Sequence, residues 1–377
     1  MLLSIILLHL CAVSSDALNT SLTLPDVLGP SLVGTVFFEL VDHTRVDPYA
    51  PTPQSRDLMV SIFYPVQHIR RYKRAPAYTS LYGDHLDTSI GLPPGTAAST
   101  TSKAYTGAYL HTDSNKQPPI ILFSSGYGNS RVDYTGTLSN LASHGYLVIG
   151  VDHPYDADFV DYPDGRNATR YTNILDPESP ETIISALDTR VKDVQFVLNV
   201  LSSNANLARQ IPGIHGKLNV SKVGMFGHSF GGAATAGTML VDPRVACGIN
   251  MDGSIFGQVL DSGLDKPFLF VDVGPSHNRT TDASWSALWL KLRGWKAELS
   301  FFGSSHAAFS DQKVLYEQLR KRGGIPDMGD YFGTIEGERQ KVLEDAYLTE
   351  FFGRCFGRRE GNLLDGPSKK FPEVVVW

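Results

Sequence analysis

The alternation of short apolar runs with helical patterns from residue 118 onward constrains the fold of this chain more than any other feature. The runs are PPIILFSSG, YLVIGVDHP, KVGMFGHS, VACGINMDG, KPFLFVDVG and KAELSFFGS, and most of them end in Gly, Asp or Ser. Because they are continuously apolar, they predict strands of a sheet that is covered on both faces. The clearest intervening helix is predicted over 179–202, where Ser179 can cap, Pro180 suits the first helical position and apolar residues recur at helical spacing. We therefore predict an α/β fold with a mostly parallel central sheet and helices on both faces.

Two further strands are expected before this region, over 34–42 and 57–65, because both segments are rich in β-branched and aromatic residues. Residues 75–117 are polar and lack periodicity, so we predict a long surface loop. Such a loop forms either a lid or pocket wall or a loosely held insertion.

The rest of the chain is predicted to belong to one domain. Helical patterns occur near 311–321 and 337–352, and the polar residues 366–377 are predicted to form a flexible tail. The single domain is then expected over 18–365.

Ser229 lies in a pattern that is typical of a nucleophile. The strand predicted over 223–226 runs into GHSFG, and very small residues follow it. In a nucleophile elbow the serine occupies a strained strand-to-helix turn, so its neighbours must lack bulk. The alternative is a tight turn without catalytic function.

A serine nucleophile needs a histidine base and a carboxylate, in the chain order Ser, acid, His. Only His277 and His306 follow Ser229. His306 comes directly after the last predicted strand, whereas His277 lies in a Pro-Ser-His-Asn turn beside a glycosylation sequon, so we predict His306 as the base and His277 as a solvated surface residue. Asp252 and Asp272 both end apolar strands, and the residues alone leave the choice of acid open.

The chain resembles the secreted, lipoprotein-associated platelet-activating-factor acetylhydrolases and their microbial relatives, a branch of the α/β-hydrolases. The likeness covers roughly residues 55–320 and rests on ASHGYLVIGVDHP, GHSFGG, MDGS and GSSHAAFSD, which begin at residues 142, 227, 251 and 303. It implies the α/β-hydrolase fold and Asp252 as the acid. Asp272 is the fallback acid, because related polyester hydrolases take theirs from the next strand.

An oxyanion hole is expected to consist of two backbone amides. One belongs to Phe230, the residue after the nucleophile. The resemblance implies that the second belongs to Tyr127, although Ser125 replaces the histidine that the family usually has in this loop.

These residues predict a serine esterase that works through an acyl-enzyme without a metal or organic cofactor, because no His/Cys cluster has zinc spacing and no GxGxxG follows a strand. The resemblance implies short acyl esters of the 1-alkyl-2-acetylglycerophosphocholine type or related lipids as substrates. The alternatives are a cutinase-like polyester hydrolase, a pathway-specific ester or lactone hydrolase, and a non-catalytic binding protein on the same scaffold. We expect a monomer that touches lipid surfaces transiently.

Charge and the first residues indicate the compartment and the partners. The net charge of −6 without a basic stripe argues against nucleic-acid binding. Residues 1–17 have the pattern of a secretory signal peptide, and an extracellular glycoprotein is expected. The sequons are at Asn19, Asn167, Asn219 and Asn278, and Cys247 and Cys355 form either one disulfide or two free thiols.

Overall fold

The computed structural model describes residues 22–111, 117–171, 174–176, 179–204, 208–323, 325, 327–358 and 361–377. The predicted signal peptide and Asn19 lie outside these residues. No helix within these ranges is both long enough and apolar enough to cross a membrane.

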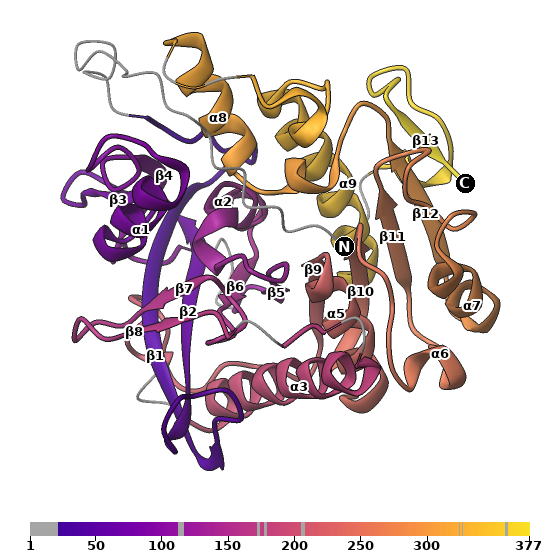
Figure 1. The fold of residues 1–377 in the computed structure, drawn as a ribbon, viewed down its shortest axis with the longest axis horizontal. Coiled ribbons are helices and arrows are strands. Elements are labelled where there is room, and N and C mark those ends of the chain that lie inside the picture. The colour runs from indigo at the N-terminus through magenta and orange to yellow at the C-terminus, as the bar shows by residue number, and fades with distance from the viewer. Residues whose placement is uncertain are drawn as a thin grey trace.

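Eleven strands of the described residues form one sheet, in the order β13-β12-β11-β10-β9-β5-β6-β2-β1-β4-β3 (Figure 1). The neighbouring strands β6, β5, β9, β10, β11 and β12 are mutually parallel, so their carboxyl ends meet at one edge of the sheet. A separate hairpin pairs β7 (Phe159–Asp161) with β8 (Asn167–Thr169). The strands of the large sheet are β1 Leu32–Val46, β2 Ser55–Val66, β3 Arg74–Pro76, β4 Thr101–Thr106, β5 Ile120–Ser124, β6 Leu147–Val151, β9 Val223–His228, β10 Val245–Met251, β11 Phe268–Asp272, β12 Lys296–Phe301 and β13 Val374–Val376.

Helices cover both faces of the sheet, and two apolar clusters fill the space between the layers. One cluster contains side chains of α3, α5, α6 and α7, and the other contains side chains of α2 and α9. The helices are α1 Ser80–Ile90, α2 Thr135–Ser143, α3 Pro180–Ser203, α5 Phe230–Val241, α6 Val259–Ser262, α7 Ala283–Lys291, α8 Gln312–Lys321 and α9 Gly337–Phe356, with single 3-10 turns η2 Arg131–Tyr134, η3 His306–Phe309, η4 Gly329–Phe332 and η5 Leu363–Asp365. The fold class predicted from the alternating apolar runs is confirmed.

The prediction of an irregular loop over 75–117 is wrong. This segment contributes to β3 and contains helix α1 and strand β4, which pairs with β1. Helix α1 fully buries only Tyr82, Gly83 and Asp87, and its apolar spacing at Tyr82, Leu86 and Ile90 is short and surrounded by polar and turn-forming residues, so the sequence did not reveal it.

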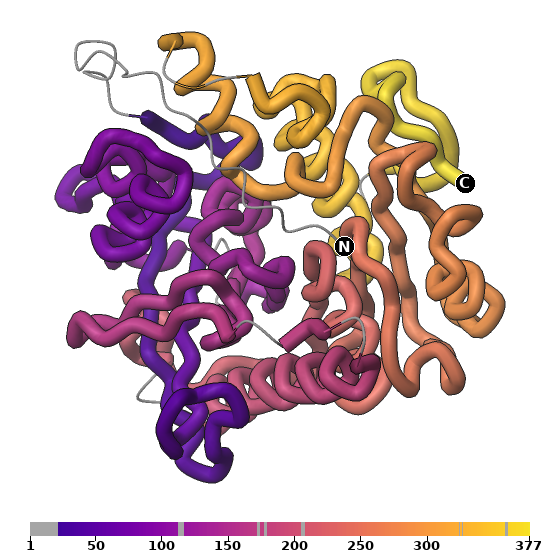
Figure 2. The backbone as a smooth tube through the Cα atoms, in the orientation of Figure 1, coloured from indigo at the N-terminus to yellow at the C-terminus, as the bar shows by residue number. Residues whose placement is uncertain are grey.

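The prediction of a flexible C-terminal tail over 366–377 is also wrong. Strand β13 pairs antiparallel with β12, and the indole of Trp377 donates a hydrogen bond to Ser300 Oγ at 2.9 Å. Figure 2 shows this yellow segment lying beside the strands at the right of the view. The run EVVVW consists mainly of β-branched and aromatic residues, which favour strands despite the polar residues before them.

Cys247 and Cys355 form a disulfide, with their Cα atoms 6.2 Å apart. The bond joins β10 in the middle of the sheet to the last turn of α9. Of the two alternatives left open by the sequence, the structure therefore contains the disulfide.

Candidate active site

Ser229 occupies a strained turn between β9 and α5. Its backbone φ is 54°, a left-handed value that costs free energy for a residue with a side chain, and its amide donates to Met251 O at 2.8 Å. A Cβ atom at Gly227 would lie 2.1 Å from the Gly231 backbone, and one at Gly231 would lie 2.0 Å from Ser124 O. The glycines are therefore required because strand, turn and helix approach one another too closely for side chains.

Asp252 follows the neighbouring strand β10 in a similar conformation. Met251 pairs with His228 across the two strands, so Asp252 lies beside Ser229 at the carboxyl edge of the sheet. The φ of Asp252 is 58°, and its amide donates to Val271 O at 2.8 Å. A Cβ atom at Gly253 would lie 1.9 Å from Ser229 O, so the turns that carry the two side chains are packed directly against each other.

His306, the first residue of η3, is hydrogen-bonded to Asp252. Its Nδ1 atom lies 2.6 Å from Asp252 Oδ2, and both residues line one cavity of about 1130 Å³ together with Ser229. The imidazole is about half exposed, whereas the Asp252 carboxylate is buried. Among the described contacts no hydrogen bond joins the Ser229 hydroxyl to His306, and such catalytic hydrogen bonds are often long in enzymes without substrate.

Asp272, the fallback acid, makes different contacts from Asp252. Its Oδ1 atom accepts a hydrogen bond from Gly274 N at 2.7 Å, and no described histidine contacts it. Burial, together with the nearby carboxylates of Glu298 and Asp252, raises the pKa of Asp272 to about 8. The structure thus brings His306 to Asp252 and not to Asp272.

The prediction that His277 is a solvated surface residue is wrong. Its Nδ1 atom lies 2.7 Å from Asp252 Oδ1, and its Nε2 atom lies 2.9 Å from Asp282 Oδ2. Only 23% of its side chain is exposed. The sequon beside it suggested an open loop, but the partners of His277 come from β10 and from the start of α7, which the local sequence does not reveal.

The loop after β5 places Tyr127 at the wall of the same cavity as Phe230. Neither backbone amide donates to an acceptor among the described residues. Ser125, which replaces the usual histidine, donates from Oγ to Asn129 O at 2.8 Å and so closes the loop on itself.

Arg190 of α3 contacts this loop through hydrogen bonds, and the sequence did not indicate that this residue belongs to the site. Its buried guanidinium donates to the carbonyl oxygens of Ser125 and Gly126, forms an ion pair with Asp156 and lies 4.8 Å from the ring centre of Phe230. One side chain therefore contacts the residues on both sides of the proposed oxyanion hole. A single arginine inside a long helical pattern gives no signal that could have identified it.

A second Ser-His-Asp arrangement lies in the core beneath the loop. His153 Nε2 lies 2.9 Å from Ser124 Oγ, and His153 Nδ1 lies 2.9 Å from Asp193 Oδ2. All three side chains are buried, and Ser124 Oγ also accepts a hydrogen bond from Arg190. Burial, reinforced by Arg190, lowers the pKa of His153, so its imidazole is neutral, and the buried cluster is a hydrogen-bonded support that substrates cannot reach.

Helix α1 forms one wall of the candidate active-site cavity. The phenol of Tyr82 donates to Asp133 Oδ2 at 2.7 Å and ties α1 to η2. The α1 residues that line the cavity are Tyr82, His85, Leu86, Ser89 and Ile90.

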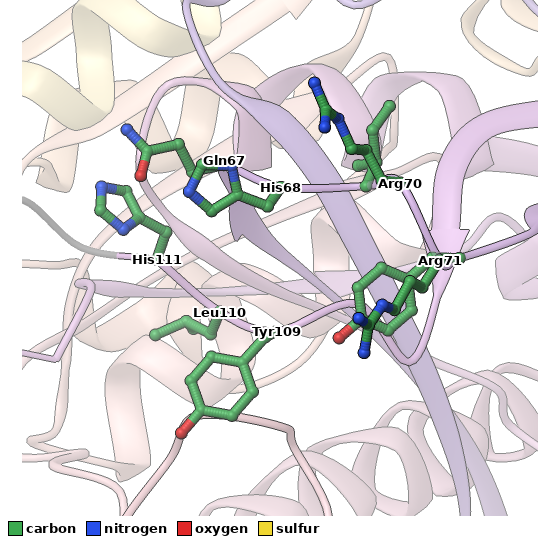
Figure 3. Close-up of a pocket in the computed structure, with 9 residues that line it drawn as sticks. Gln67, His68, Arg70, Arg71, Tyr109, Leu110 and His111 are labelled. Carbon is green, nitrogen blue, oxygen red and sulfur yellow. The ribbon is translucent and has the colours of Figure 1, made fainter.

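A second cavity, of about 680 Å³, contains none of the predicted catalytic residues (Figure 3). It is lined by the segments 67–72 and 109–111, with Arg70, Arg71 and Tyr109 around it. Strand β2 runs antiparallel to β6, so its end at Val66 lies at the amino edge of the parallel strands, opposite Ser229.

The sequons within the described residues differ in exposure. Asn167 and Asn219 are exposed, whereas Asn278 is half-buried and its amide donates to Gly274 O at 2.9 Å. Attachment of a glycan to Asn278 would replace one of the two hydrogens on this side-chain nitrogen.

Comparison with known proteins agrees with the class that the fold and the cavity indicate. A solved ferulic acid esterase from Streptomyces cinnamoneus superposes with a TM-score of 0.80 at 30% identity, covering 95% of this chain and 99% of the esterase. The chain is therefore a carboxylic ester hydrolase with the α/β-hydrolase fold. It belongs to the platelet-activating factor acetylhydrolase, isoform II, family, whose profile matches residues 19–163 and 180–322. The family resemblance seen in the sequence is confirmed.

Two relatives illustrate the extent of the similarity. The protein named probable 1-alkyl-2-acetylglycerophosphocholine esterase of Arthroderma benhamiae is 32% identical, and the alignment covers 97% of each chain. The platelet-activating factor acetylhydrolase of Cavia porcellus is 31% identical over 55% of this chain, which spans about half the length of that relative.

Proposed function

We propose that this protein is a secreted serine esterase that releases the short acyl group of 1-alkyl-2-acetylglycerophosphocholine or a closely related lipid ester. The observation that carries the proposal is the 2.6 Å hydrogen bond between His306 and Asp252, in the cavity that Ser229 also lines. This is the imidazole-carboxylate pair that an activated serine requires.

In the proposed mechanism Ser229 Oγ attacks the ester carbonyl and His306 Nε2 takes the hydroxyl proton. Asp252 accepts from His306 Nδ1, which holds the imidazole in the tautomer that has a free Nε2 atom and stabilises the imidazolium that forms. The amides of Tyr127 and Phe230 donate to the oxyanion of the tetrahedral intermediate. His306 then protonates the leaving alkoxide. In the second half of the reaction His306 deprotonates a water molecule that attacks the acyl carbon, and it returns this proton to Ser229 Oγ as the acid is released.

The relative with the widest alignment supports the choice of substrate, because its name specifies the 1-alkyl-2-acetylglycerophosphocholine ester. The cavity of about 1130 Å³ is large enough to receive a glycerolipid headgroup with its short acyl chain. A long polymer would need an open cleft, and the wall formed by α1 counts against the polyester alternative.

A second candidate substrate is an ester of an aromatic acid such as ferulic acid. It is favoured by the structural similarity to the ferulic acid esterase over nearly the whole chain. Aromatic residues along the cavity, among them Tyr127, Phe230 and Phe256, could stack on such an acyl group.

The test compares initial rates on p-nitrophenyl esters from acetate to palmitate, on p-nitrophenyl ferulate and on 1-alkyl-2-acetylglycerophosphocholine. We expect the highest kcat/KM for acetyl esters, and a loss of several orders of magnitude in kcat for Ser229→Ala and His306→Ala. Ser185→Ala, an exposed serine of α3, is the matched control and should behave as wild type. A Ser229→Ala variant that keeps wild-type activity would rule out the mechanism, and a preference for ferulate would reassign the substrate.

Secretion is tested separately by expressing the full chain in a eukaryotic host. We expect the enzyme in the medium with an N-terminus near residue 18, as determined by N-terminal sequencing. Retention of an intact N-terminus inside the cells would contradict this part of the proposal.

A further inference from the structure

The Asp252 carboxylate is shared by two histidines. Oδ2 is 2.6 Å from His306 Nδ1, and Oδ1 is 2.7 Å from His277 Nδ1. Among the described residues these are the side chains that contact its two oxygens. The proposed triad needs only His306, so the second imidazole has no function in it.

Asp252 depends on such contacts more than an ordinary aspartate would. Its backbone has a φ of 58° and its carboxylate is buried, so both strain and desolvation oppose the observed arrangement. Loss of one donor would leave a buried carboxylate oxygen unsatisfied and would free the group to rotate about its χ angles.

His277 is itself fixed from the opposite side. Its Nε2 atom bonds to Asp282, which caps helix α7 by accepting from the amides of Ser284 and Trp285. With a carboxylate at each ring nitrogen, both nitrogens must carry protons to donate, so the ring is a cation. Burial lowers its pKa, but the hydrogen bonds to Asp252 and Asp282 outweigh this and raise the pKa of His277 to about 10.

The surrounding titratable groups do not supply another cation to Asp252. Asp272 and Glu298 lie on β11 and β12, and Arg279 is paired with Glu298. His228 lies behind His306 with ring centres 4.6 Å apart, and burial together with His306 holds the pKa of His228 well below its usual value, so this ring is neutral.

We propose that His277 is a positioning residue for the esterase reaction. As a cation between Asp252 and Asp282, it orients the Asp252 carboxylate and reduces the electrostatic attraction between that carboxylate and protonated His306. The inference rests on the proposed function of Ser229, Asp252 and His306. Its physical basis is that the positive charge of His277 opposes a second positive charge on His306, across one shared carboxylate.

The test is the pH dependence of kcat/KM for p-nitrophenyl acetate in wild type, His277→Ala, His277→Asn and His144→Ala. Asparagine places an uncharged amide near the position of Nδ1, so it restores a donor without the charge. His144 is the matched control, because its side chain is 22% exposed and bonds to Asp345 at 3.0 Å but does not line the candidate active-site cavity.

We expect His277→Ala to lower kcat/KM by about ten- to a hundredfold, the cost of one unsatisfied buried acceptor. We also expect the acid limb of the pH profile of kcat/KM to lie about one pH unit higher in this variant than in wild type. His277→Asn should recover most of the lost rate at pH 9 but keep the shifted acid limb, whereas His144→Ala should match wild type in both.

A purely structural histidine, packed 5.0 Å from the ring of Trp285, would lower stability without moving the acid limb. An acid limb of His277→Asn that coincides with wild type would overturn the inference, and this variant decides the matter even if His277→Ala does not fold. Ser229→Ala is assayed in parallel to distinguish failure of this inference from failure of the proposed function. If Ser229→Ala is inactive while the His277 variants keep the wild-type acid limb, only the function of His277 is refuted.

Discussion

At the scale of single residues, the candidate site concentrates its strain in two neighbouring positions. Ser229 and Asp252 both have left-handed φ values, and both follow adjacent parallel strands. Backbone strain of this kind persists only where contacts with the surrounding structure hold the residue in that conformation. Here the fit of Gly231 against Ser124 and of Gly253 against Ser229 supplies that constraint.

Asp272 offers a test of stability against pH that does not depend on catalysis. Its folded-state pKa of about 8 exceeds the value of about 3.9 for an unperturbed aspartate, so the folded state binds an extra proton between these values. This contribution to stability is present at low pH and is lost as pH rises through about 8. We expect Asp272→Asn, which keeps an acceptor for Gly274 N, to be more stable than wild type at pH 9 by up to about 5 kcal/mol and to differ little at pH 4.

Urea unfolding at the two pH values measures this difference. Asp252→Asn is the contrasting variant: it should lower kcat by about 10⁴-fold, whereas Asp272→Asn should keep most of the activity. A stability difference that is the same at both pH values would refute the raised pKa, and a larger kinetic loss at Asp272 would make it the acid.

Ser229 and His306 could be predicted as site residues from the sequence because their signals are local or ordered along the chain. GHSFG follows an apolar strand, and His306 follows the last one. The prediction failed at His277, whose partners Asp252 and Asp282 lie 25 and 5 residues away and meet it only through the folding of β10 and α7.

At the scale of elements, the loop after β5 and the start of α5 are held together by α3. Arg190 bonds to the carbonyl oxygens of the loop and packs on the ring of Phe230, so one side chain links the two segments that carry the amides of Tyr127 and Phe230. The charge is matched by Asp156, and the planar guanidinium contacts several acceptors at once.

We expect Arg190→Lys to lower kcat by about a hundredfold with a small change in KM, because a lysine keeps the pair with Asp156 but loses the fork that holds the loop. Steady-state kinetics with p-nitrophenyl acetate measure the effect. Arg244→Lys is the control, since Arg244 pairs with Asp242 away from the cavity. Equal kcat values for both variants would show that the loop keeps its geometry without Arg190.

Strands and helices differed in how well the sequence predicted them. The six continuous apolar runs all became strands of the sheet, because burial on both faces leaves a strong compositional signal. The helix predicted over 179–202 is α3, although the Ser179 side chain makes no capping hydrogen bond. Helix α1 was missed because its apolar face is short: Tyr82 and Leu86 pack in a small cluster that also contains Phe159, a residue distant in the sequence.

At the scale of the whole molecule, the disulfide is the longest-range covalent constraint. It joins positions 108 residues apart and anchors α9 to the central strand β10. In the chain-entropy model, closing a loop of this length stabilises the fold by about 4 to 5 kcal/mol.

The double variant Cys247→Ala/Cys355→Ala should therefore lose about 4 kcal/mol of unfolding free energy, measured in urea at pH 7. Its kcat/KM at 25 °C should stay close to wild type, because the disulfide does not line the cavity. Reduced wild type should unfold like the double variant. Unfolding curves that coincide with oxidised wild type would contradict the stabilising contribution of the bond.

The two outermost strands of the large sheet, β3 and β13, span three residues each. Long, flat outer strands leave a row of unpaired peptide groups that can recruit another polypeptide into ordered aggregates. Pro76, which has no backbone amide hydrogen to donate, lies in β3, and Trp377 directly follows β13. Outermost strands this short leave few unpaired peptide groups with which another polypeptide could pair.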